Sequence, residues 1–208
     1  MSKGEQTRAA IVDHAVDHAS EVGLEGLSIG SLAIRLKLSK SGLFAHFGSK
    51  QELQLATLRR AQERFEDQVF RPSVAAPRGL PRLRLLFRNW LEWLGQQPGG
   101  CVILSASTEF DDRPGAVRDA LVAGQRQLRG AIAKAIRLAI EAGELRPDVD
   151  PWQLAFELFG AMLAAHHDWH LLEDKRAFDR ALQAIDSLLA ANARSPREPS
   201  RTHKETRP

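Results

Sequence analysis

The segment "LSKSGLFAHFGSK", residues 38–50, combines small residues and basic residues in a way that suits contact with a nucleic acid. In a helix that starts near residue 40, Leu43 and Phe47 lie four residues apart and face inward together with Leu38. The opposite face carries Lys40, Ser41, Gly42, Ala45 and His46. Small residues let a helix axis approach the major groove closely, so hydroxyl and ammonium groups can reach base edges. The alternative interpretation is a solvated helix face interrupted by a glycine.

Lys50 opens the next predicted helix, where its ammonium group and the free backbone N–H groups can both bind phosphate. The chain carries basic residues and no acidic residue between positions 35 and 50: Arg35, Lys37, Lys40 and Lys50. The total net charge of +3 is less informative. From Arg194 onward there are five basic and two acidic residues, so the rest of the chain carries 24 of each. The basic patch between residues 35 and 50 is therefore more informative about binding than the net charge of the whole chain.

Helical periodicity recurs along the whole chain, and an all-α fold is predicted. Ser28 is expected to cap the second helix, and Ser49 to Glu52 reads as a capping box that opens the fourth. The two short helices joined by a tight turn and packed on the first helix form a helix-turn-helix. The predicted helices span residues 5–22, 29–36, 40 onward, 49–70, 80–97, 102–108, 116–142, 150–171 and 174–192.

Four regions follow from this pattern. Residues 1–48 form the helix-turn-helix domain, and residues 49–72 form a connecting helix that breaks at Arg71-Pro72. Residues 80–193 form a larger helical domain. Residues 194–208 lack apolar periodicity and are expected to be a disordered basic tail.

The stretch "LSIGSLAIRLKLSKSGLFAHFGSKQEL", residues 27–53, resembles the DNA-binding signature of TetR-family transcriptional regulators. The resemblance implies that Ser28 caps the second helix against a phosphate. It also implies that Lys40, Ser41, Gly42 and Ala45 face bases, while His46 and Lys50 contact the backbone. The whole protein is then expected to be a ligand-responsive dimeric regulator, most often a repressor, that binds a pseudo-palindromic double-stranded operator.

Two residues depart from the family pattern. Phe44 stands where the family usually has tyrosine, so a phenolic hydrogen bond to phosphate is lost while the ring can still pack. Lys37 stands where the family usually has a turn glycine, so it must adopt whatever backbone geometry that turn demands.

The last two predicted helices are the best candidates for a homodimer interface, because the helix over 150–171 is apolar around more than one face. The alternative is a thick monomer core. The candidate interface residues are Phe156, Leu163, His167, Phe178, Leu182, Ile185 and Leu189.

The resemblance also implies a pocket for a small-molecule effector among the middle helices. Residues that suit its lining are Trp90, Trp93, Phe110, Phe159 and Met162. Aromatic and methionine residues at helical spacing also form ordinary core, which is the alternative for each of them.

His166 and His170 share a helix face at the spacing of two metal ligands, but no third ligand is evident, so no metal site is predicted. The alternative is a pair of polar histidines at a helix end or interface. Cys101 is expected to be buried packing rather than a redox sensor, and a single cysteine fits a reducing cytoplasm.

The sequence gives little support to other function classes. No cofactor is predicted, and no catalytic motif supports an all-α enzyme. A non-specific architectural DNA-binding protein that uses the basic tail is a further alternative. The N-terminus lacks the apolar region of a signal peptide, and no membrane contact is expected.

Overall fold

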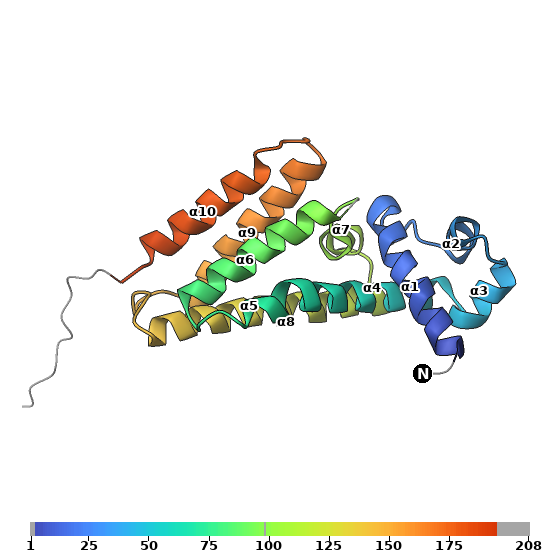
Figure 1. The fold of residues 1–208 in the computed structure, drawn as a ribbon, viewed down its shortest axis with the longest axis horizontal. Coiled ribbons are helices and arrows are strands. Elements are labelled where there is room, and N and C mark those ends of the chain that lie inside the picture. The colour runs from blue at the N-terminus through green and yellow to red at the C-terminus, as the bar shows by residue number, and fades with distance from the viewer. Residues whose placement is uncertain (1–2, 98, 195–208) are drawn as a thin grey trace, which may run out of the picture.

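The computed structural model describes residues 3–97 and 99–194, and these are almost entirely helical. Figure 1 shows an elongated molecule with helices α1 to α3 at one end and α10 toward the other. The β structure in the described ranges amounts to one isolated antiparallel bridge between Leu145 and Ala193. The predicted all-α fold is confirmed.

The N-terminal end holds α1 (Lys3–Val22), α2 (Ile29–Leu36) and α3 (Lys40–Phe47). Gly23, at φ 79°, ends α1 in the left-handed conformation that glycine adopts without strain. Leu24, Leu27, Leu32 and Leu43 are fully buried between these helices. Their burial fixes the angle between α2 and α3, the two helices of the predicted helix-turn-helix.

The connecting helix α4 (Lys50–Phe65) does not break at Arg71-Pro72 as the sequence predicted. It continues through a π-helical segment, η1 (Glu66–Phe70), into α5 (Arg71–Ser73). A proline ring clashes with the carbonyl four residues earlier in a regular α-helix. In the widened turn before Pro72, the Arg71 N–H instead bonds the carbonyl of Glu66, five residues back.

The remaining helices are α6 (Leu80–Gln96), α7 (Val102–Glu109), α8 (Ala116–Glu141), α9 (Pro151–His170) and α10 (Ala177–Ala191). Their bounds agree with the predicted ones to within a few residues. Asp150 caps α9 as its sequence indicates, with its carboxylate accepting from the N–H of Trp152 at 2.8 Å. Figure 1 shows α8 lying along the length of the molecule.

Two hydrophobic clusters hold the fold together, and α7 contributes to both. Val102, Ala106 and Phe110 pack with the core of α1 to α4, as does the first part of α8 through Val117 and Leu121. Cys101 and Leu104 belong instead to the core of α6, α8, α9 and α10. A domain boundary between residues 72 and 80 remains a prediction. Phe65 and Val69, which precede it, pack in the same core cluster as the helices that follow it.

The predicted tail lies outside the described residues except for Arg194, whose N–H bonds the carbonyl of Glu144 at 2.9 Å. Across residues 3–97 and 99–194, no helix combines the length and apolar character needed to cross a membrane.

Candidate nucleic-acid interface and internal cavity

Helix α3 presents a thin polar face outward and is anchored from behind. Leu43 and Phe47 are buried, as predicted. Phe44 is 53% exposed. The other predicted contact residues on this helix are exposed, with only His46 half-buried: Lys40, Ser41, Gly42 and Ala45. A helix with this arrangement can enter a groove without moving its core residues.

The N-terminus of α3 is capped by Ser39, whose hydroxyl accepts from the N–H of Gly42 at 3.1 Å. A Cβ added at Gly42 would lie 2.9 Å from the Ser39 hydroxyl oxygen. The glycine therefore allows this cap to form closely, in addition to thinning the exposed face.

Lys37 ends α2 in the left-handed region, at φ 56° and ψ 36°. Its N–H bonds the carbonyls of Ala33 and Ile34, which is the turn that the usual glycine would make. The same turn leaves Leu38 47% exposed, so the prediction that Leu38 faces inward is wrong. The reversal of the chain at Lys37 directs the next residue to the surface.

The capping box lies at Ser28 rather than at Ser49. The Ser28 hydroxyl accepts from the Ser31 N–H at 3.0 Å, and the Ser31 hydroxyl accepts from the Ser28 N–H at 3.1 Å. Ser49 does cap α4 by accepting from the Glu52 N–H at 3.1 Å. Its own N–H, however, donates to the carbonyl of Phe47, so the reciprocal half of the predicted box is replaced.

Two members of the predicted basic patch have acidic partners. Arg35 donates to both carboxylate oxygens of Glu21, at 2.6 and 2.7 Å. Lys50 donates to Glu25 at 3.1 Å, and this hydrogen bond is the main cause of the lowered pKa of Glu25. Lys37 and Lys40 are the remaining exposed cations of the patch. Periodicity along one helix could not reveal these pairs, because both acids lie in other segments.

Arg8 of α1 supports the far end of α3. Its Nε donates to the carbonyl of His46 at 3.4 Å, and its guanidinium carbon lies 5.1 Å from the centre of the Phe47 ring. Arg8 was not among the predicted site residues, and its spacing from α3 in the sequence gives no signal.

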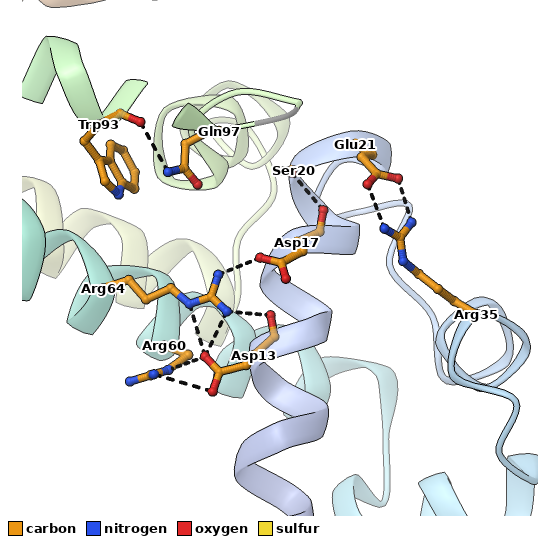
Figure 2. Close-up of polar contacts among 9 residues, drawn as sticks. All are labelled: Asp13, Asp17, Ser20, Glu21, Arg35, Arg60, Arg64, Trp93 and Gln97. Atoms are coloured by element: carbon orange, nitrogen blue, oxygen red, sulfur yellow. Dashed lines mark hydrogen bonds and ion pairs between the residues drawn. The ribbon is translucent and has the colours of Figure 1, made fainter. Parts of the chain in front are cut away.

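Ion pairs fix α1 to α4, as Figure 2 shows. Arg64 donates to Asp17 at 2.6 Å and to both the carboxylate and the carbonyl of Asp13 at 2.8 Å. Arg60 donates to the Asp13 carboxylate at 2.7 Å. Burial alone would raise the pKa of Asp13, but the hydrogen bonds from Arg60 and Arg64 outweigh it and lower that pKa. Side chains of α4 are therefore tied to α1 by several charged hydrogen bonds.

A cavity of about 730 Å³ is lined by residues of the α4–η1–α5 segment and α8, with further lining residues from α6 and α7. Trp90, one of the predicted pocket residues, is part of its lining. Phe65, Leu104, Leu128 and Cys101 also line it, and the sequence did not single out the first three.

The other four predicted pocket residues are not part of this lining. Trp93, Phe159 and Met162 are buried in the core, where Trp93 packs edge-on against Phe65 at 5.2 Å. Phe110 lines a separate hollow of about 340 Å³ instead. Trp93, Phe159 and Met162 therefore fill space between helices, which was the alternative for each of them.

The predicted interface residues divide by exposure. Phe156 and Leu163 are 61% and 44% exposed, and His167 is exposed as well. Phe178 and Leu182 are half-buried. Ile185 and Leu189 are buried in the core of their own chain, so the prediction that they contact a partner needs correction. Trp152, which is 55% exposed one turn before Phe156, was not among the predicted interface residues.

His166 and His170 form a pair beside the loop before α7. The Cys101 N–H donates to Nε2 of His166 at 3.2 Å. A Cβ added at Gly100 would lie 3.0 and 3.1 Å from the Nε2 atoms of the two rings. Burial, together with His170 and His167, lowers the pKa of His166 to about 4. The described part of the chain holds no group of three or more His, Cys, Asp or Glu placed to bind a metal ion.

Comparisons with known proteins match most of the chain. Residues 11–57 match the family described as bacterial regulatory proteins, tetR family. Residues 79–185 match the family described as tetracyclin repressor-like, C-terminal domain. The chain is 26% identical over 151 residues to the transcriptional regulator AcuR of Cereibacter sphaeroides, covering 70% of this chain and 68% of that one.

Solved structures agree with these matches. A TetR transcriptional regulator from Chloroflexus aurantiacus superposes with a TM-score of 0.85 at 26% identity, covering 93% of this chain and 99% of that one. AibR, solved in complex with isovaleryl coenzyme A and operator DNA, superposes with a TM-score of 0.68 at 23% identity, covering 89% and 97%.

Proposed function

Because this chain belongs to the TetR family of bacterial transcriptional regulators, we propose that it is a homodimeric repressor released from a pseudo-palindromic operator by a small molecule. The observation that carries the proposal is the exposed face of α3, backed by the buried anchors Leu43 and Phe47.

Helix α3 suits direct readout of the major groove. Lys40 and Ser41 stand at its first turn, where the side chains of a recognition helix reach base edges. Gly42 and Ala45 add little bulk, so the helix axis can lie deep in the groove. Lys50, at the N-terminus of α4, suits a phosphate contact that sets the register of the protein on the duplex.

A second copy of the chain is the proposed occupant of the exposed face of α9. Trp152, Phe156, Leu163 and His167 lie at positions i, i+4, i+11 and i+15, which share one side of a helix. A two-fold interface brings the same patch of each subunit together, so this stripe can be covered by its own copy. Two α3 helices would then face successive half-sites of a palindrome.

The cavity is the proposed effector site. Its volume of about 730 Å³ lies within the range of small-molecule pockets. AibR, which shares this fold, was solved with both an acyl coenzyme A and operator DNA. That precedent supports a cavity and a DNA-binding end that act together in one chain.

The DNA-binding proposal is tested by fluorescence anisotropy with duplexes from the region upstream of the gene, each compared with a scrambled duplex at moderate salt. Wild-type protein should prefer one duplex by about 10³-fold or more. Lys40→Ala should reduce that preference, while Lys134→Ala, which removes an exposed charge from α8, should not. Equal affinity for all duplexes would contradict the proposal.

Two further variants test its other parts. Phe156→Glu should convert a dimer to monomers in light scattering, while Leu172→Glu, at an equally exposed apolar residue, should not. Removal of residues 195–208 should leave operator preference intact. Loss of that preference with the tail would favour a non-specific architectural role.

A further inference from the structure

The smaller hollow, of about 340 Å³, is lined by residues of α7 and α8 and of the turn that follows α7. Four of its lining side chains lie at positions i, i+4, i+8 and i+11 on one face of α8: Arg118, Val122, Arg126 and Arg129. The opposite face of α8 lines the cavity, through residues such as Gly124, Leu128 and Ala131. Gln125 lines both. The hollow is therefore a site separate from the proposed effector cavity.

The lining of the hollow carries an excess of positive charge. It includes the side chains of Arg118, Arg126 and Arg129 and, on the acidic side, that of Asp111. Across residues 3–97 and 99–194, none of these arginines forms an ion pair with a carboxylate. Arg118 donates from Nε to the backbone carbonyl of Asp111 at 2.9 Å. The guanidinium carbon of Arg129 lies 4.2 Å from the centre of the Phe159 ring.

Arg118 and Arg129 are half-buried, which makes the missing counter-ion significant. Arg64 of α4 is also half-buried, and it pairs with Asp13 at 2.8 Å and with Asp17 at 2.6 Å. Moving a charge out of water is costly unless it is paired. The buried polar atoms that lack a partner in the described chain belong to other residues. The free nitrogen atoms of Arg118 and Arg129 therefore remain accessible to a ligand.

The apolar part of the lining limits the size and character of that ligand. Phe110 and Leu121 are buried in the core shared with α1 to α4, and Val122 is half-buried. A volume of about 340 Å³ is at the lower end of the range for small-molecule sites. It suits one ring or a short chain joined to a charged group.

We propose that the smaller hollow binds a small organic anion, with its acid group on the arginines of α8 and its apolar part against Phe110, Leu121 and Val122. A guanidinium presents a fork of N–H donors that matches the oxygens of a carboxylate or a phosphate. Such a ligand supplies the counter-ion that Arg118 and Arg129 lack. This site goes beyond the proposed function, because neither operator recognition nor the effector cavity uses it.

NMR titration of the full-length protein with four one-ring probes tests this proposal, because it both detects weak binding and locates it. The probes are phenyl phosphate, benzoate, benzyl alcohol and benzylamine. The better of the two anions should bind at least about ten-fold more tightly than the alcohol and the amine, since only an anion forms charge-assisted hydrogen bonds with arginine. It should shift the Nε–H signals of Arg118 and Arg129. The comparison of phenyl phosphate with benzoate identifies the preferred acid group.

Substitution of the arginines tests their role. Arg126→Gln should weaken binding of the anion by about five-fold or more and leave benzyl alcohol unchanged, and Arg129→Gln should do the same. Arg137→Gln is the matched control, at an exposed arginine of α8 outside the lining, and should change neither. Arg126 is exposed, so its variant keeps the test valid even if Arg129→Gln fails to fold.

Two bulky substitutions on α8 separate this site from the cavity. Val122→Phe fills the hollow and should weaken binding of the anion. Ala131→Phe adds the same bulk to the lining of the cavity and should leave binding of the anion unchanged.

Binding of the alcohol or the amine as tight as that of the anions would overturn the proposal, as would unchanged anion binding in folded Arg126→Gln and Arg129→Gln. Anion binding that is lost in Ala131→Phe and kept in Val122→Phe would place the ligand in the cavity and also overturn it. Absence of binding by both anions at about 10 mM would do the same. None of these titrations contains DNA, so their results do not depend on whether the protein is a repressor.

Discussion

The carboxylate of Glu109, at the end of α7, accepts a 2.7 Å hydrogen bond from the backbone N–H of Glu25, in the loop between α1 and α2. The loop is shaped for this contact. Gly23 has no side chain, and a Cβ there would lie 2.6 Å from the Glu109 carboxylate. This hydrogen bond joins the loop before α2 to the end of α7, two segments that lie far apart in the sequence.

This contact connects the cavity with the proposed DNA-binding end. Helix α7 carries Leu104 of the cavity near its first turn and Glu109 at its last. The Glu25 carboxylate in turn contacts Lys50 at 3.1 Å and Arg113 at 3.7 Å. A displacement of α7 would therefore move the loop between α1 and α2, whose Glu25 side chain pairs with Lys50 of α4.

Replacement of Glu109 tests that connection without a ligand. Glu109→Ala should speed amide exchange of residues 23–28 by about ten-fold, because one charge-assisted hydrogen bond is lost. Glu109→Gln, which keeps an acceptor oxygen, should have a smaller effect. Hydrogen exchange by mass spectrometry measures both, with Glu141→Ala as a control at an exposed acid of α8. Equal exchange in all three variants would show that Glu109 does not restrain the loop.

Lys37 should be a site where glycine stabilises the protein. A left-handed backbone costs a non-glycine residue about 1–2 kcal/mol, and glycine relieves this strain. The greater conformational freedom of glycine in the unfolded chain offsets part of the stabilisation. Lys37→Gly should raise the free energy of unfolding by up to about 1 kcal/mol in urea titration. Lys37→Ala, which removes the same charge without relieving the strain, should not raise it. A similar gain for both variants would attribute the effect to charge.

Acidification should destabilise the protein through His166. Burial keeps this ring neutral and lowers its pKa to about 4, whereas the unfolded chain takes up the proton near 6.5. Stability is therefore full above pH 6.5 and falls as the pH drops toward 4. Thermal unfolding of His166→Gln, which keeps a non-titrating acceptor for the Cys101 N–H, should depend less on pH in this window. Identical pH profiles would show that His166 does not titrate as its surroundings indicate.

Phe44→Tyr should strengthen binding to every duplex by about the same factor. The ring is 53% exposed on α3, so an added hydroxyl can reach phosphate, which carries no sequence information. Anisotropy titrations with the operator and a scrambled duplex measure the two factors. A gain confined to the operator would mean that this face of α3 contacts bases instead.

Features that depend on local periodicity and on helix capping could be predicted from the sequence. Leu43 and Phe47 are buried four residues apart on one helix, and Asp150 caps α9 where its type and the following proline indicated. These features depend on residues close together in the chain.

Features that depend on contacts between distant segments were not predicted. Glu25 pairs with Lys50, and Arg64 pairs with Asp13, only because the fold brings distant segments of the chain together. Ile185 was predicted to contact a partner but is buried in the core of its own chain. The sequence pattern of an apolar helix face is the same in both cases, so it cannot distinguish them.

Hydroxyl-radical footprinting of the wild-type protein on the upstream duplex tests the central claim most directly. A dimer that inserts α3 into the major groove should protect two half-sites about one helical turn apart, or a multiple of that spacing. Lys40→Ala should weaken both half-sites together. Uniform protection along the duplex, or a pattern unchanged by Lys40→Ala, would contradict sequence-specific recognition by α3.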